Sequence, residues 1–233
     1  MAVSAACKAD RRSRRSRQLL RRAFTEELAG GEDLSRITVA ALADRAGLTR
    51  RTFYTHYRDI PDFVEQLEGA LLADIRTLVA QVGATSLPEL YDSIDDLEPC
   101  PGSVELLAYF KDNHELIGAL LGPGGDPAFM PKLIEIARAE IAGRMRTGIV
   151  PAALGAFFDY YLTYVVNAEA GVILRWLETG LKESPRTMAC VMTVIAFARP
   201  GDLYGMPIDI NVPAYGLKLM SLGASEREGG PND

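Results

Sequence analysis

The most regular hydrophobic pattern in the chain begins after Thr38. Apolar residues recur there at spacings of three and four, which places them on one face of an α-helix: Val39, Leu42, Ala43 and Ala46. Thr38 stands just before this face, where its hydroxyl can accept a hydrogen bond from a free helix N–H group. Gly47 stands just after it, where a residue in the left-handed conformation commonly ends a helix. The pattern predicts a short helix between these two residues.

A second short helix is expected to follow, with Thr49 as its N-terminal cap. Phe53 and Tyr57 are four residues apart and can form its buried face. The remaining positions then face outward; they are Arg50, Arg51, Thr52, Tyr54, Thr55 and His56. Two short helices joined by a tight turn form a helix-turn-helix motif, whose second helix can enter the DNA major groove.

The outward-facing residues have side chains suited to DNA. Arginine can donate two hydrogen bonds to guanine, threonine can bond a base edge or contact a thymine methyl group, and tyrosine can bond a phosphate. We therefore take these six residues, with the two cap residues Thr38 and Thr49, as candidate DNA contacts. The alternative is a small helical hairpin whose basic face is only solvated.

The block ITVAALADRAGLTRRTFYTHYRD, residues 37–59, resembles the TetR family of transcriptional regulators. A basic helix of suitable length precedes it, and Thr52, Tyr54 and His56 lie at the family's distance from Gly47. Close resemblance covers the first 65 residues, roughly; beyond them only the order and length of the helices are similar. Many members have a lysine at the start of the next helix that reaches a phosphate, whereas this chain has Asp59-Ile-Pro there.

The distribution of charge separates the chain into two parts. Residues 1–58 contain 13 Lys and Arg against 6 Asp and Glu, a net charge of +7, although the whole chain carries −6. The remainder is therefore acidic, at −13. A basic head on an acidic body is the asymmetry expected of a protein that contacts nucleic acid at one end.

The pattern of apolar residues predicts an all-α fold in four segments. We expect a basic disordered arm over residues 1–15, a helix-turn-helix head over 16–60, a helical body over 61–198 and an irregular tail over 199–233. Helices of the body are expected over residues 61–83, 87–97, 104–121, 129–147, 151–177 and 185–198. The helix that begins near Pro61 would connect the head to the body.

Aromatic side chains with polar tips recur along the body helices. Such residues can line an apolar cavity that supplies a few directed hydrogen bonds. The candidate effector contacts are Phe110, His114, Phe158, Tyr161 and Tyr164. They would suit a small, mostly apolar effector; the alternative is that they only fill the core.

The last two body helices contain a pattern of small and apolar residues that would suit a homodimer. Its members are Ala168, Gly171, Met188, Val191, Met192 and Ile195. Small residues allow a second helix to approach closely. The TetR resemblance implies that the last two helices of each subunit form a four-helix dimer interface.

The sequence gives little support to other classes of protein. The sequence has no GxSxG, P-loop, HExxH or strand-linked GxGxxG motif, so no enzyme, cofactor or metal site is expected. Three cysteines without CxxC spacing, no signal-peptide pattern and no long uncharged apolar run favour a cytoplasmic protein away from membranes.

The resemblance and the charge pattern together predict a DNA-binding transcriptional regulator, most simply a repressor that responds to a small molecule and binds a pseudo-palindromic double-stranded operator. Two alternatives stay open. One is a helical ligand-binding protein or enzyme with an incidental helix-turn-helix, and the other is a regulator controlled by a protein partner.

Overall fold

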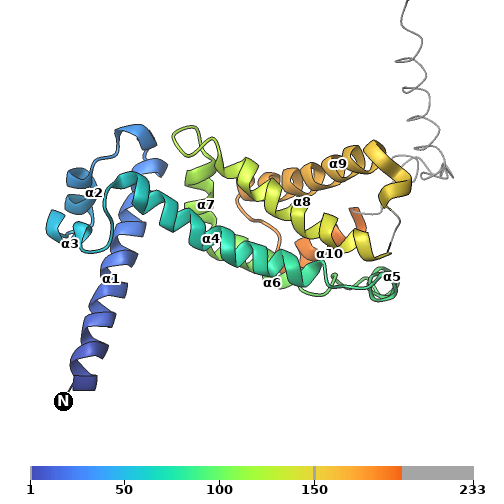
Figure 1. The fold of residues 1–233 in the computed structure, drawn as a ribbon, viewed down its shortest axis with the longest axis horizontal. Coiled ribbons are helices and arrows are strands. Elements are labelled where there is room, and N and C mark those ends of the chain that lie inside the picture. Colours follow the sequence, from blue (N-terminus) through green and yellow to red (C-terminus); the bar gives the residue numbers. More distant parts are fainter. Residues whose placement is uncertain (1, 149–150, 196–233) are drawn as a thin grey trace, which may run out of the picture. The chain divides into compact units, whose positions relative to one another are not determined.

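The computed structural model describes residues 2–148 and 151–195, and over these ranges the chain is helical with no strand (Figure 1). The predicted all-α fold is therefore confirmed. The described residues form two compact units. Of the described residues, unit 1 comprises those up to Ile75 together with Asp112–Leu133, and unit 2 comprises Arg76–Lys111 and those from Ile134 to residue 195. The predicted tail over 199–233 lies outside the described residues.

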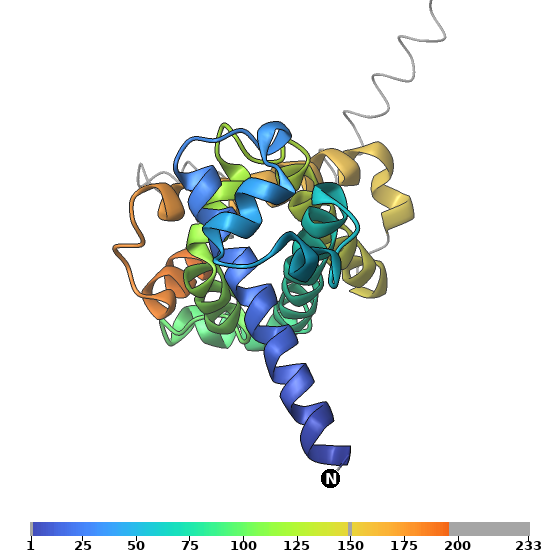
Figure 2. The same ribbon diagram turned by 90° about the vertical axis from the view of Figure 1, so that its left-hand side faces the viewer.

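Unit 1 is built on a long first helix. It contains α1 (Ala2–Ala29), the 3₁₀ helix η1 (Leu34–Arg36), α2 (Val39–Arg45), α3 (Arg50–Tyr54), the first part of α4 (Ile60–Val82) and α7 (His114–Leu121). The helix starts earlier than expected, because the segment predicted as a disordered arm is helical from Ala2. No glycine or proline occurs between residues 2 and 29, and alanine and arginine both favour helix. Figures 1 and 2 show the N-terminal turns of α1 extending past α2 and α3.

The core of unit 1 is aromatic. Phe24 of α1, Phe53 of α3 and Phe63 of α4 are fully buried. The ring of Phe63 lies 5.2 Å from that of Phe24 and 6.0 Å from that of Phe53, measured between centroids. Edge-to-face and tilted contacts of this kind add to the stability that burial of the rings provides. The core therefore joins the first helix, the helix-turn-helix and α4.

Residues 104–121 were expected to form one helix, and that prediction is wrong. The chain forms α6 (Ser103–Asp112) and then α7, with a break at Asn113, whose φ of −108° and ψ of 13° are not helical. The Asn113 side-chain oxygen accepts a hydrogen bond from Arg21 Nη2 on α1 at 2.5 Å. The break directs the apolar face of α7, with Leu116, Ile117 and Leu120 buried, into unit 1.

The turn predicted at Gly122–Gly125 ends α7 as expected, and two of its glycines are required sterically. A Cβ atom on Gly124 would lie 2.4 Å from the carbonyl oxygen of Glu32, and one on Gly125 would lie 2.1 Å from that of Leu120. The Leu34 amide donates to the Gly124 carbonyl at 2.8 Å. The turn therefore packs closely against the loop that follows α1.

Unit 2 contains the end of α4, α5 (Leu87–Asp95), α6, most of α8 (Phe129–Gly148), α9 (Pro151–Glu178) and α10 (Pro185–Ile195). The predicted proline starts of α9 and α10 are confirmed. Trp176 of α9 is 2% exposed, and its indole N–H donates to the Glu183 carbonyl at 3.3 Å. Thr193 of α10 accepts from the Cys100 amide at 2.8 Å. Of the helices in the described ranges, none combines the length and apolarity needed to cross a membrane.

Candidate DNA-binding surface

The helix-turn-helix is held by two threonine caps and one left-handed glycine. Thr38 accepts from the Ala41 amide, and Thr49 accepts from the Thr52 amide, each at 3.2 Å. Each cap satisfies one of the free N–H groups at a helix start. Gly47 has a φ of 64°, which glycine adopts at little cost. The local geometry predicted from the sequence is thus present at both helix starts and at the turn.

One face of the motif is buried and the other is open. Leu42 and Phe53 are fully buried, and the Phe53 ring lies 5.4 Å from the ring of Tyr57. The α3 helix is shorter than expected, but the amides of residues 55–57 continue to bond to carbonyls within it. Exposed on its other face are Arg50, Arg51, Tyr54 and Thr55.

Side-chain hydrogen bonds within the chain involve five of the eight candidate DNA contacts, namely Thr38, Thr49, Thr52, Thr55 and His56. His56 is half-buried and shares a 2.7 Å hydrogen bond between its Nε2 and the hydroxyl of Ser16 on α1. Burial, assisted by the nearby charge of Arg17, lowers the pKa of His56 and favours the neutral ring. The Thr52 hydroxyl lies 2.9 Å from that of Thr49. His56 therefore connects α1 to the helix-turn-helix, and this tertiary contact was not visible in the sequence.

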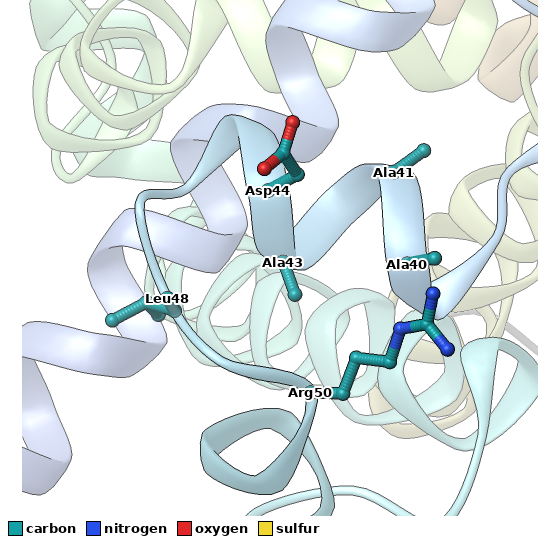
Figure 3. Close-up of a pocket in the computed structure, with 6 residues that line it drawn as sticks. All are labelled: Ala40, Ala41, Ala43, Asp44, Leu48 and Arg50. Atoms are coloured by element: carbon teal, nitrogen blue, oxygen red, sulfur yellow. The ribbon is translucent and has the colours of Figure 1, made fainter.

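A shallow pocket of about 400 Å³ lies where α2 meets the start of α3 (Figure 3). Figure 3 shows the Arg50 side chain extending from α3 toward Ala40, at the beginning of α2. Ala40 and Ala41 of α2 line this pocket together with Arg50. Arg50 therefore presents its guanidinium group beside an open surface.

The start of α4 differs from the lysine-bearing pattern of the family, and the structure gives Asp59 a local role. Its carboxylate accepts from the Asp62 amide at 2.8 Å, as an N-cap residue does. Asp62 in turn accepts from the Arg58 amide at 2.8 Å. These carboxylates stabilise the junction between the helix-turn-helix and α4.

Basic side chains on α1 add to the positive surface of unit 1. Arg11, Arg12, Arg15 and Arg17 are exposed. Because α1 is helical here, these charges are displayed along a rigid element. Such a row can contact phosphates without reading sequence.

The five candidate effector residues line neither the pocket between α2 and α3 nor the larger cavity in unit 1. His114 is exposed and belongs to unit 1, whereas the other four belong to unit 2. Phe110 is 6% exposed and Phe158 is half-buried, but Tyr161 and Tyr164 are 41% and 68% exposed. The two phenylalanines are therefore shielded from solvent at least in part, whereas the two tyrosines are exposed.

The candidate dimer residues lie on α9 and α10 and are mostly open to solvent. Ala168, Gly171, Val191 and Ile195 are exposed, Met192 is half-buried and Met188 is buried. Tyr160 and Tyr164 continue the exposed face of α9, and Val194 continues that of α10. Among the described residues, unit 2 thus leaves a run of small, apolar and aromatic side chains exposed on α9 and α10.

Glu169 of α9 is a candidate functional residue that our sequence interpretation missed. Burial raises its pKa to about 7. The available signal was a lone acidic residue among the apolar residues of a long helix, VVNAEAGVIL. A carboxyl group that titrates near neutral pH can change its charge with small changes in its surroundings.

The stability of the protein should therefore depend on the charge of Glu169. Its pKa is raised in the folded state, so the folded protein binds the proton more tightly and stability is lost as pH rises from about 4.5 to about 7. We expect the Glu169→Gln variant to be more stable than wild type at pH 8, by about 3 kcal/mol, and to differ little at pH 4. Urea unfolding of both proteins at these pH values measures the difference. An equal stability difference at the two pH values would contradict the assignment.

Comparison with known proteins finds similarity to transcriptional regulators. A TetR family model, described as the transcriptional regulator C-terminal region, matches residues 98–197. The chain is also 31% identical over 180 residues to YxbF of Bacillus subtilis (strain 168), an uncharacterized HTH-type transcriptional regulator. This match covers 77% of the chain and 44% of the relative, so the chain spans less than half of that protein's length. The helix-turn-helix in unit 1 and these two similarities agree with the resemblance of the sequence to the TetR family of transcriptional regulators.

Proposed function

We propose that this chain is a sequence-specific DNA-binding repressor that acts as a homodimer and is released from DNA by a small apolar molecule. The observation that carries the DNA-binding part is the exposed face of α3. Arg50, Arg51, Tyr54 and Thr55 are open to solvent while Phe53 anchors the helix in the core. A recognition helix needs this combination of a rigid support and free side chains.

Several side chains of this face would contact DNA. Arginine can bond the O6 and N7 atoms of guanine, and Thr55 can contact a base edge or a thymine methyl group. Tyr54 is 58% exposed and is long enough to donate to a phosphate. Thr52 and His56, which have internal partners, would mainly hold the helix in position.

Arginines of α1 would supply affinity without specificity. Each phosphate that they neutralise releases counterions, so binding should weaken steeply with salt. The acidic remainder of the chain would be repelled by DNA, which favours approach through unit 1. This division agrees with the net charge of +7 on residues 1–58.

The homodimer is supported by the exposed residues of α9 and α10. Val191, Val194 and Ile195 are 38%, 47% and 43% exposed, and together with the open backbone at Gly171 they form a surface that a second copy could cover. Two heads in one dimer would read two half-sites whose centres are about 34–36 Å apart. The operator would then be a pseudo-palindrome.

The effector part rests on the apolar interior of unit 2. Phe110 and Phe158 are candidates for the wall of a cavity, and Glu169 is a candidate for a polar contact. An effector that binds one conformation of the body better than another would shift the conformational equilibrium of the dimer toward the conformation that it prefers. The size of this shift cannot exceed the difference between its binding free energies for the two conformations. Release follows if the favoured conformation holds the heads at a spacing that does not match the operator.

Selection of bound DNA from a random pool tests this function. The full chain is expected to enrich one sequence with internal two-fold symmetry. The control is the Arg50→Ala, Arg51→Ala double variant, which should enrich that sequence poorly. Recovery of DNA without any common sequence would indicate a non-specific binder and would contradict the proposal.

A further inference from the structure

A second cavity, of about 890 Å³, lies within unit 1. Its walls come from the η1 segment, the N-terminal half of α4 and the segment between α7 and Lys132. Much of the lining is apolar and includes Leu34, Ile37, Val64, Leu72, Pro123 and Pro127. A volume of this size is in the range of small-molecule sites, and every lining residue belongs to the unit that carries the helix-turn-helix.

The polar part of the lining is centred on Glu68, which is only 2% exposed. Its Oε2 atom accepts from the Lys132 ammonium at 2.5 Å, and the same ammonium donates to Asp126 Oδ2 at 2.8 Å. The second oxygen of Glu68, Oε1, is buried without a hydrogen-bond partner. A buried acceptor left without a partner is costly, so a ligand that supplies a donor there would gain binding energy.

Charge defines the kind of ligand that fits. The cavity is lined by four carboxylates, those of Asp33, Glu65, Glu68 and Asp126, and by the single ammonium of Lys132. One cation between Glu68 and Asp126 leaves a negative charge uncompensated. Burial raises the pKa of Glu68, the neighbouring Asp126 raises it further, and the Lys132 ammonium opposes that rise. A second cation beside Glu68 would act in the same direction as Lys132 and would favour the charged carboxylate.

We propose that this cavity binds an amphipathic organic cation, a protonated amine attached to an apolar group. The ammonium donates to Oε1 of Glu68, and the apolar group lies against the leucine, valine and proline side chains. Lys132 has a side chain that is 43% exposed, so it can move aside and give the ammonium access to Glu68. The site differs from the apolar effector site proposed for unit 2.

Occupation of the cavity would stabilise unit 1. The η1 segment that forms one wall is followed directly by Ile37 and Thr38, the cap of α2. A bound cation would connect this segment to α4 and to the turn after α7. Ligand binding and DNA binding would therefore involve the same folded unit.

Three matched compounds test the charge requirement on the full chain: 4-phenylbutylamine, 4-phenylbutanol and 4-phenylbutyrate. Calorimetric titration is expected to give at least tenfold tighter binding for the amine than for the alcohol, with the carboxylate weakest. The Glu68→Gln variant should lose at least tenfold in amine affinity. Glu115→Gln, an exposed substitution on α7 outside the cavity, should bind as wild type does. Equal binding of the three compounds, or unchanged affinity in Glu68→Gln, would overturn the proposal.

A second variant keeps the test valid if Glu68→Gln fails to fold. Gly69 lines the cavity, and a Cβ added there would meet no atom within 4 Å. Gly69→Trp should therefore fold and fill part of the cavity, with at least a tenfold loss of amine binding. Gly118→Trp, at an equally open position outside the cavity, is the control. Amine binding that survives in Gly69→Trp would place the ligand elsewhere and reject this site.

Discussion

The Gly171→Trp variant is expected to be a folded monomer that binds operator DNA about 100- to 10,000-fold more weakly than the wild type. In the single chain a Cβ atom added to Gly171 would meet nothing within 4 Å, so the structure has room for a larger side chain. The indole would collide only with a second chain placed against α9. Loss of the dimer removes the gain in effective concentration that two connected heads provide.

Sedimentation and DNA binding should be measured on the same samples. Wild type is expected to sediment as a dimer at micromolar concentration, and Gly171→Trp as a monomer with an unchanged helical spectrum. Gly118→Trp, on α7, provides the same change in size at another open glycine and should remain a dimer. A Gly171→Trp dimer with normal operator affinity would show that this face of α9 is not the interface.

Substitution of either exposed arginine of α3 should weaken specific binding by about 1–3 kcal/mol if that side chain contacts guanine through two hydrogen bonds. Arg50→Ala and Arg51→Ala leave the buried face of the motif unchanged, because both residues are exposed. Affinity for a scrambled sequence should change much less, since a non-specific complex lacks those base contacts. Binding to both DNAs across a salt series measures the two effects separately.

The matched control for these arginines is Arg76→Ala, which removes the same charge from an exposed position of α4 in unit 2. It should leave specific and non-specific binding nearly equal to those of the wild type. If neither α3 variant differs from this control in operator affinity, α3 is not the recognition helix.

Local signals were sufficient to predict the helix-turn-helix and most helix starts. Thr38 and Thr49 both cap their helices, and Pro151 and Pro185 begin α9 and α10. Each of these residues acts on neighbours within one turn of helix. Their effects therefore appear directly in the sequence, and short motifs are enough to identify them.

Features that depend on residues far apart in the sequence were not predictable in this way. The break at Asn113 is accompanied by a bond from Arg21, and the break separates one predicted helix into α6 and α7. Glu68 and Lys132 are 64 positions apart, and neither has a sequence signal for the ion pair that they form. Such partners become visible only when the fold brings them together.

The choice of candidate effector residues shows the same limit. Aromatic residues at helical spacing indicate that a face is apolar, but they do not show whether it covers a core or remains open. Phe110 is buried, whereas Tyr164 on α9 is 68% exposed. Glu169 also lies on α9, and its pKa is raised to about 7. A single acidic residue does not form a recognisable sequence pattern, so it was not selected as a candidate.

Side chains of α3 are proposed to read DNA bases, and selection of bound DNA with the Arg51→Ala variant tests this role most directly. Wild type and variant are compared on the same random pool at the same salt concentration. The predicted result is that both enrich the same symmetric sequence with the same spacing, and that the variant accepts other bases at one position of each half-site. The proposed role would be contradicted if the Arg50→Ala and Arg51→Ala chains both enriched the wild-type sequence and both discriminated between bases at every position as the wild type does.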